Sequence, residues 1–434
     1  MQLNVDDLNI AVVGIGYVGL PLALELSKHF EVVGFDTNKL RVQNLCNNID
    51  SNNEFSTEDL SNYRCKFTSN LDEISSANLY IITVPTPIDK KNEPDLSILL
   101  DATKAISKFV CRGDIIVYES TVYPGVTEDL CGPIIEEISG LRSNKDFHLG
   151  YSPERINPGD AEHTIDKITK VVSAQNSETL GLLAELYGKL NSNNVFKAKN
   201  IKTAEAAKAI ENAQRDINIA FMNEVAMLLT KMDLTAFDVL KAAKTKWNFL
   251  PFSPGLVGGH CISVDPYYLA KKAIMVGHTP EILLSGRKIN DSMGMFIAKQ
   301  IAKFFNHVEE PTKLKNQKIL VLGISFKENV NDIRNTKVID IVSGLNACGY
   351  EVDVYDPLAS STEVLNAYGL NLLNKLSFEQ KYDCVVLAVT HREFVGMSVE
   401  EIEGLIKAKN SIIYDIKGSW SEHKFSEPLR YFSL

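Results

Sequence analysis

Near its start the chain carries the stretch Asn9-Ile-Ala-Val-Val-Gly14-Ile-Gly16-Tyr-Val-Gly19, an apolar run that ends in spaced glycines. This pattern is typical of a buried strand that turns tightly into a helix, whose N-terminus then faces a pyrophosphate. The following residues predict a helix over 20–29 and a second strand over 31–35, which ends at Asp36. A carboxylate there accepts hydrogen bonds from adenosine ribose hydroxyls and repels a 2′-phosphate. The stretch therefore predicts a dinucleotide-binding βαβ unit that takes NAD rather than NADP.

Two more apolar runs, over 79–84 and 114–118, predict further strands of the same sheet. Polar residues follow each run, in Thr83-Val-Pro-Thr-Pro87 and in Glu119-Ser-Thr121. Parallel sheets bind ligands at the carboxyl ends of their strands, so these hydroxyls are candidate donors to the cofactor or to an activated water. Ordinary strand-to-helix turns explain the same residues equally well.

The run from 201 to 231 has high helix propensity and no internal glycine or proline. Its length indicates one long helix that bridges domains or builds a dimer interface, with two shorter helices as the alternative. One face of this helix carries Lys208, Asn212, Arg215 and Ile219. A lysine and an asparagine one turn apart suit a site where negative charge grows on a carbonyl oxygen, although a solvated face explains them too.

A second strand–turn–helix–strand unit follows in the last third of the chain. After Pro311 and a lysine-rich linker over 312–318, its expected parts are a strand at 319–322, a turn at Gly323, a helix over 336–347 and a strand over 351–355 that ends at Asp356. Runs at 385–389 and 411–414 predict further strands. We therefore predict an α/β fold with two Rossmann-like doubly wound domains, joined by a long central helix and a helical middle domain. The expected domains are 1–200, 201–310 and 311–434.

The bulk composition narrows the class of protein. The chain has 434 residues and a net charge of −10, which argues against a nucleic-acid partner that needs a broad basic surface. Seven cysteines, an odd number, do not resemble a disulfide framework. No signal-peptide pattern and no membrane-spanning run is read in the sequence. We expect a cytoplasmic protein with neither a membrane nor a nucleic-acid partner.

Cys261 lies in the glycine-rich run Gly258-Gly-His-Cys261-Ile-Ser-Val-Asp265. In a chain that binds NAD, such a cysteine suggests covalent oxidation: a thiolate traps an aldehyde, a second oxidation gives a thioester, and water releases a carboxylate. A cysteine in a cytosolic protein is more often a buried apolar filler. His260 stands beside it without a second His or Cys at ligand spacing, so we expect no metal site.

Two further segments place charged residues after predicted strands. Glu154 and Arg155 follow the predicted strand 147–151 in Ser-Pro-Glu-Arg, where a capping or ion-pairing role is the simpler explanation. Lys327 and Arg334 follow the strand at 319–322 and can offer charge to a diphosphate, with surface ion pairs as the alternative.

Together these motifs resemble the UDP-glucose/GDP-mannose dehydrogenase family, NAD-dependent enzymes that oxidise the C6 hydroxyl of a nucleotide sugar to a carboxylate in two steps. The resemblance rests, in order, on the segments Gly14–Pro21, Thr83–Pro87, Glu119–Gly125, Ser152–Glu154, Ala204–Lys208 with Asn212, Gly258–Cys261 with Asp265, and Phe326–Lys327 to Arg334. It implies a UDP-sugar substrate and a homodimer built through the central helices.

The resemblance also implies roles for individual residues. Cys261 resembles the nucleophile, and Lys208 and Asn212 the groups that stabilise oxyanion intermediates. Asp265 resembles an acid that works through water or Lys208, whereas Thr121 and Glu154 match the residues that position the hydrolytic water. The candidate cofactor contacts are Gly14, Gly16, Tyr17, Val18, Gly19, Asp36, Arg41, Thr83, Pro85, Thr86, Ser120, Thr121 and Arg334. The candidate substrate contacts are Glu154, Arg155, Lys208, Asn212, Arg215, Phe249, Gly255, Gly258 and Lys327.

Departures from the family pattern bear on the sugar. Family members that act on UDP-glucose often carry a second Glu where this chain has Pro158, and a serine where it has His260. The run from Ser152 to Gly159, in combination with Trp247–Phe252 and Val257–Cys261, is most similar to the subgroup that oxidises UDP-N-acetylhexosamines (UDP-GlcNAc or UDP-GalNAc) for capsule or O-antigen polysaccharides. A UDP-glucose or UDP-N-acetylmannosamine dehydrogenase with the same mechanism stays open, as does a non-catalytic NAD-binding sensor.

Overall fold

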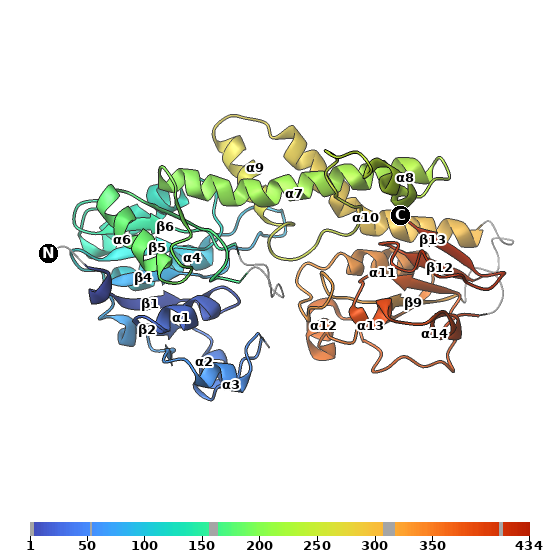
Figure 1. Cartoon of the computed structure of the whole chain (residues 1–434), viewed down its shortest axis with the longest axis horizontal. Coiled ribbons are helices and arrows are strands. Elements are labelled where there is room, and N and C mark those ends of the chain that lie inside the picture. Colours follow the sequence, from blue (N-terminus) through green and yellow to red (C-terminus); the bar gives the residue numbers. More distant parts are fainter. Residues whose placement is uncertain (1–3, 53, 156–163, 307–316, 408–410) are drawn as a thin grey trace. The chain divides into compact units, whose positions relative to one another are not determined.

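A computed structural model describes residues 4–52, 54–155, 164–306, 317–407 and 411–434. These residues form two compact α/β units (Figure 1). The first unit is Met1–Glu211 with Tyr267–Thr279, and the second is Asn212–Pro266 with Pro280–Leu434. The division of the chain into three domains stays a prediction. Pro158, the linker residues 312–316 and the boundary at 310 and 311 lie outside the described residues.

The first unit is built on an eight-stranded sheet with the order β3-β2-β1-β4-β5-β6-β7-β8. Its strands are β1 (Asn9–Val13), β2 (Glu31–Phe35), β3 (Lys66–Thr68), β4 (Leu79–Ile82), β5 (Ile115–Tyr118), β6 (His148–Tyr151), β7 (Lys170–Ala174) and β8 (Val195–Lys197). The first six run parallel, so their carboxyl ends meet at one edge. β7 joins β6 antiparallel, which reverses the direction of the last two strands.

Helices cover this sheet on both faces. They are α1 (Gly19–Ser27), α2 (Lys39–Cys46), α3 (Thr57–Ser61), α4 (Ser97–Ser107), α5 (Gly132–Ser139) and α6 (Ser177–Gly188), with short 3₁₀ turns at Val5–Asp7 and Leu71–Ile74 and a π-helical segment at Val126–Cys131. On one face, Ile10 and Val12 of β1 pack in a core with Leu20 and Leu24 of α1. The central strands β4 and β5 are buried and apolar along their whole length, as expected where helices cover both faces of a parallel sheet.

One helix belongs partly to each unit. α7 (Ile201–Thr230) is a single unbroken helix, so the alternative of two shorter helices is wrong. The boundary between the units falls inside it, after Glu211. In Figure 1 it is the long green ribbon. The α7 residues up to Glu211 therefore belong to the first unit, and those from Asn212 onward belong to the second.

The second unit contains a fully parallel sheet with the order β10-β9-β11-β12-β13. Its strands are β9 (Lys318–Leu322), β10 (Glu351–Tyr355), β11 (Cys384–Leu387), β12 (Ile412–Asp415) and β13 (Arg430–Ser433). Its helices are α8 (Ala236–Ala243), α10 (Glu281–Asn306), α11 (Val338–Ala347), α12 (Ser361–Tyr368), α13 (Arg392–Val395) and α14 (Val399–Gly404). α9 (Asp265–Met275) begins in this unit and continues in the first.

Successive side chains along the strands of the second unit point to opposite faces of the sheet and belong to two separate apolar cores. Ile319 and Val321 face α10 and α11, whereas Leu320 and Leu322 face α13 and α14 with the buried Trp420. The predicted strands at 31–35 and 351–355 are confirmed residue for residue, and the α/β class is confirmed with them. Among the described helices, none combines the length and the apolar character that crossing a membrane requires.

Candidate active site

The glycine turn after β1 has the geometry that a dinucleotide requires. Gly14 has φ of +98°, a left-handed conformation that favours glycine. A Cβ on Gly19 would lie 1.9 Å from the Gly14 carbonyl oxygen, so α1 packs against the turn only with glycine there. A Cβ on Gly16 would meet no protein atom within 4 Å, and this open side is where a pyrophosphate fits. Tyr17 and Val18, beyond it, are half-buried.

Asp36 closes the turn from the end of β2. It is half-buried, and its carboxylate accepts hydrogen bonds from the Ile15 amide at 2.9 Å and from the Asn38 amide at 2.8 Å. Arg41 is buried behind the same turn: it donates to the Ile15 carbonyl at 3.0 Å and pairs with Asp50 at 2.5 Å. Arg41 therefore supports the backbone of the turn, and a direct contact with the cofactor stays a prediction.

The hydroxyls at the ends of β4 and β5 tie the carboxyl edge of the sheet together. Thr83 donates to the Gly14 carbonyl at 2.7 Å, Ser120 to the Val84 carbonyl at 2.6 Å, and Thr86 to the Thr121 carbonyl at 2.7 Å. Pro85 is exposed beside them. Because each hydroxyl donates its proton to a backbone carbonyl, its oxygen can only accept a hydrogen bond from a ligand.

Glu154 and Lys208 come together after β6. Lys208, on α7, donates to the Glu154 carbonyl at 2.6 Å, and both residues are buried. The Arg155 amide donates to the Glu154 carboxylate at 2.6 Å. The Arg155 guanidinium pairs at 3.0 Å with Glu211, one turn beyond Lys208. Predicted residues from two segments far apart in sequence therefore meet at the carboxyl edge.

The loop that carries Thr121 is held to α7 by an unpredicted residue. Glu205 is fully buried and accepts hydrogen bonds from the amides of Gly125 at 2.5 Å and Thr127 at 3.0 Å. Burial raises the pKa of this carboxyl, and the two amide donors oppose the rise. Glu205 and Lys208 lie one turn apart, so α7 is bonded to the ends of both β5 and β6.

In the second unit, Cys261 lies in a turn that leads into α9. The amide of Asp265 donates to the Cys261 carbonyl at 2.8 Å, and the Asp265 carboxylate accepts from the Asn212 side chain at 2.5 Å. Asp265 is buried, whereas Cys261 and Asn212 are half-buried. The structure thus brings three predicted catalytic residues together, with Asp265 between the cysteine turn and α7.

The backbone near Cys261 is held by close packing. A Cβ on Gly258 would lie 2.6 Å from the Asn335 carbonyl oxygen, and the Asn335 side chain donates to the Gly259 carbonyl at 3.0 Å. Further back, the side chain of Asn223 on α7 exchanges two hydrogen bonds with the backbone of Gly255, at 2.8 and 3.0 Å. Gly255 and Gly258 therefore shape the loop through their backbones.

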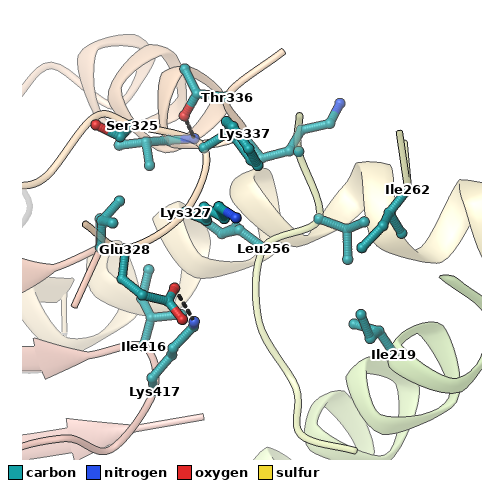
Figure 2. A pocket seen from close by; sticks show the side chains of 16 residues that line it. Ile219, Leu256, Ile262, Ser325, Lys327, Glu328, Thr336, Lys337, Ile416 and Lys417 are labelled. Atoms are coloured by element: carbon teal, nitrogen blue, oxygen red, sulfur yellow. Dashed lines mark hydrogen bonds and ion pairs between the residues drawn. The ribbon is translucent and has the colours of Figure 1, made fainter. Parts of the chain in front are cut away.

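A cavity of about 140 Å³ adjoins this loop (Figure 2). Ile219 and Ile262 line one side of it, and Lys327 extends into it from the loop after β9. Glu328 pairs with Lys417 at 3.1 Å at its rim. The complete lining is Ile219, Leu256, Val257, Gly258, Ile262, Ser325, Phe326, Lys327, Glu328, Thr336, Lys337, Val338, Ala388, Val389, Ile416 and Lys417.

Arg334 lies beside the cysteine loop. It pairs with Asp332 at 2.6 Å, and its guanidinium is 3.3 Å from the ring of His260, the neighbour of Cys261. Burial acts to raise the pKa of Asp332, but the hydrogen bonds from Arg334 outweigh it and lower that pKa. Arg215 is exposed on α7, and Phe249 is half-buried in the segment after α8. Their predicted substrate contacts stay predictions.

Three buried polar residues form a cluster near Glu154 that no sequence pattern predicted. Lys170 pairs with Glu119 at 2.7 Å and with Glu154 at 3.6 Å, and the Tyr187 hydroxyl donates to Glu119 at 2.5 Å. Lys170 begins a strand that no pattern predicted. Nothing in the local sequence links residues that are 51 and 68 positions apart.

A glycine turn open to a pyrophosphate lies in an eight-stranded doubly wound sheet, and Lys208 of α7 bonds to Glu154 after β6 of that sheet. These features define the class as a dinucleotide-dependent oxidoreductase. Three family models match the chain: the NAD binding domain over residues 8–191, the central domain over 202–292 and the UDP binding domain over 320–422. The chain belongs to the UDP-glucose/GDP-mannose dehydrogenase family. It is an NAD-dependent oxidoreductase that acts on a UDP-sugar, which confirms the resemblance, the enzyme class and the cofactor expected from the sequence.

Individual relatives agree over nearly the full chain. A UDP-N-acetyl-D-glucosamine 6-dehydrogenase of Salmonella typhi is 46% identical over 417 residues, covering 96% of this chain and 97% of the relative. One of Pseudomonas aeruginosa is 48% identical over 419 residues, covering 96% and 98%. A solved UDP-D-ManNAc dehydrogenase from Pyrococcus horikoshii has a TM-score of 0.87 at 28% identity, covering 97% of this chain and 98% of that one.

Proposed function

We propose that this chain oxidises the C6 hydroxyl of a UDP-N-acetylhexosamine to the uronate, with UDP-GlcNAc preferred over UDP-GalNAc. The preference for UDP-GlcNAc is supported by the names of two relatives that are 46% and 48% identical over 96% of the chain. The observation that carries the chemistry is the turn in which Asp265 bonds to Cys261 and Asn212. Cys261 is also half-buried rather than enclosed in a core, which suits a reacting thiol better than a structural filler.

NAD, bound at the Gly14–Gly19 turn, supplies the electron acceptor for each of two oxidations. The side chains of Lys208 and Asn212 stabilise the negative charge that grows on the C6 oxygen. The Cys261 thiolate then adds to the C6 aldehyde, the aldehyde oxygen takes up a proton to give a thiohemiacetal, and loss of two electrons and two protons gives a thioester. Lys327 contributes positive charge toward the diphosphate of the nucleotide sugar.

The last step returns the thiol. A water held by Thr121 and Glu154 adds to the thioester carbonyl, the carbon–sulfur bond breaks, and the carboxylate leaves. One sugar alcohol, two NAD⁺ and one water therefore give one uronate, two NADH and three protons. The sensor alternative predicts no NADH with any UDP-sugar.

Two measurements test this proposal: the number of NADH formed per uronate, and the activity of a variant without the Cys261 sulfur. NADH is followed at 340 nm, and uronate is counted by mass. We expect two NADH per uronate, and a ratio of one would indicate a simple alcohol dehydrogenase. Cys261→Ala should retain NAD binding and lose uronate formation at least about 1,000-fold, in keeping with removal of a nucleophile. Normal uronate production by that variant contradicts the mechanism.

The sugar is tested by comparing kcat/KM for UDP-GlcNAc, UDP-GalNAc, UDP-ManNAc and UDP-glucose. UDP-ManNAc is the second candidate, because a protein with that printed specificity has a TM-score of 0.87 and 28% identity to this chain. A tenfold or greater preference for UDP-ManNAc or UDP-glucose would replace the proposed substrate without changing the chemistry.

We also propose a homodimer that works in the cytoplasm and supplies the uronate for a surface polysaccharide such as capsule or O-antigen. The dimer is supported by exposed apolar residues on the long helices: Phe221 and Leu228 of α7 are each 57% exposed, and Ile282 of α10 is 69% exposed. Large apolar side chains left exposed on helices suit an interaction surface. Light scattering of the full chain should give twice the 48.2 kDa mass of one chain, and a Phe221→Glu variant should give the single mass.

A further inference from the structure

A buried ionic cluster lies beneath Glu154 in the first unit. Lys170, the first residue of β7, is only 4% exposed at its side chain. Its ammonium is 2.7 Å from the Glu119 carboxylate, at the end of β5, and 3.6 Å from the Glu154 carboxylate, after β6. One cation therefore faces two carboxylates from neighbouring strands.

Both carboxylate oxygens of Glu119 accept hydrogen bonds from protein side chains. Its Oε2 accepts from Lys170, and its Oε1 accepts from the Tyr187 hydroxyl of α6 at 2.5 Å. The Lys170 ammonium also lies 5.1 Å from the centre of the Tyr187 ring. Glu119 is fully buried, so it holds Lys170 in place and touches no ligand.

The cluster pairs one ammonium with two carboxylates, and Lys208 brings a second buried cation to the Glu154 carbonyl. Buried charges are tolerated where each is paired and hydrogen-bonded. Burial acts to lower the pKa of Lys170, but Glu119 and Glu154 outweigh it and raise that pKa. Burial raises the pKa of Glu119, and Lys170 opposes the rise. The ammonium thus persists at neutral pH between the two acids.

The Glu154 backbone and carboxylate are fixed from three directions. Lys208 binds its carbonyl, the Arg155 amide binds Oε1 at 2.6 Å, and Lys170 faces Oε2. We propose that Lys170, held by Glu119 and Tyr187, is a positioning residue that orients the Glu154 carboxylate toward the hydrolytic water. This inference rests on the proposed function, because it assigns Lys170 to the thioester-cleaving step alone.

In that step the water oxygen adds to the thioester carbonyl while Glu154 takes one water proton. The carbon–sulfur bond then breaks, Cys261 leaves as the thiolate, and the proton passes from Glu154 to solvent. This hydrolysis involves no oxidation or reduction, and it follows the two oxidations that form both NADH. A defect confined to Glu154 positioning therefore leaves the two oxidations intact and traps the thioester.

The test compares Lys170→Met with Lys189→Met, using UDP-GlcNAc and NAD. Lys189 is a matched control, since it pairs with Asp6 at 2.8 Å on the same unit but does not belong to the cluster. We expect kcat of Lys170→Met to fall about 100-fold, the scale of general base catalysis, with KM changed less than about threefold. Lys189→Met should keep the normal kcat.

Three readouts separate positioning from a general loss of structure. Lys170→Met should show a rapid burst of two NADH per chain and then accumulate a covalent thioester, visible as added mass after acid quench. Hydroxylamine, which attacks the thioester without a base, should restore turnover and yield a hydroxamate.

The outcomes also separate the two proposals. Loss of kcat without a trapped thioester or hydroxylamine rescue, or an unchanged kcat, overturns the role of Lys170. If the wild-type chain itself forms no thioester and Cys261→Ala makes uronate normally, the proposed function fails instead. Should Lys170→Met not fold, Tyr187→Phe removes one hydrogen bond to Glu119 and should show the same trapped thioester, with kcat lowered about tenfold. Lys170→Arg keeps the positive charge and should retain most of kcat.

Discussion

The two units repeat one piece of backbone and use it differently. In each, a glycine with φ near +90° follows the first strand (+98° at Gly14 and +91° at Gly323). In each, the glycine amide donates at 2.8 Å to the carbonyl of the residue before an aspartate. The isoleucine that follows each glycine donates its amide to the carboxylate of that aspartate. The local hydrogen bonds are thus the same at Asp36 and Asp356.

The difference lies in what fills the turn. Gly16 leaves the first turn open, whereas the corresponding Ser325 is fully buried and donates to Asp356 at 3.0 Å. His391 also donates to Asp356, at 3.1 Å, because its other ring nitrogen accepts from the Asn329 amide. Asp356 therefore anchors the loop that carries Lys327, while Asp36 keeps a partly exposed carboxylate for a ligand. One backbone motif binds a cofactor only where side chains leave room.

The largest effect is expected from Gly19→Ala. Its new Cβ would lie 1.9 Å from a backbone oxygen of Gly14, so the turn must shift, and we expect a loss of about 3 kcal/mol in unfolding free energy. NAD binding, measured by calorimetry, should weaken about 100-fold or more. Gly16→Ala is the matched control: it should unfold like the wild type yet bind NAD about tenfold more weakly. Equal stability of both variants would contradict the packing argument.

Asp356→Ala is expected to cost about 2–3 kcal/mol in stability, since it leaves the buried His391 and several amides without an acceptor. Burial acts to raise the pKa of Asp356, but the hydrogen bonds from His391 and Ile324 overcome it and lower that pKa. A depressed folded pKa stabilises the protein above the unfolded value of about 4, and this contribution is lost as the pH falls through the folded pKa. Urea unfolding at several pH values should show the gap between wild type and variant narrowing below about pH 4.

Asp36→Ala sharpens the comparison on the ligand side. Removing the acceptor for the ribose hydroxyls should weaken NAD binding about tenfold and reduce the preference over NADP, because the repelling charge is gone. Stability should change by about 1 kcal/mol or less, since Asp36 is half-exposed. A stability loss as large as that of Asp356→Ala would show that both aspartates are structural.

The smallest effect is expected from Ser325→Gly, which gives the second turn the Gly-Ile-Gly of the first. It should cost about 1 kcal/mol through one lost hydrogen bond and a more flexible chain. Calorimetry should still find one NAD per chain, because Asp356 keeps its protein donors. Binding of a second NAD would mean that the serine alone closes this turn.

Much of the site could be predicted wherever a short segment carries its own signal. The glycines before α1, the acid at the end of β2 and the cysteine loop each combine local backbone demands with a recognisable spacing. Lys170, Glu119 and Tyr187 could not be predicted, since the β6–β7 antiparallel pairing brings them together and no local pattern announces it. Thr83 and Ser120 were predicted as cofactor contacts, yet their hydroxyl protons are bound by the backbone.

Sequence alone determined the α/β class and the glycine turn of the NAD-binding unit, because glycine conformation, strand burial and helix periodicity are short-range demands. Tertiary structure decided which of the two aspartates remains available and which buried ammonium faces Glu154. Those outcomes depend on distance and desolvation between residues that the chain places tens of positions apart, and hydrogen bonds and charges act only once folding has closed that distance.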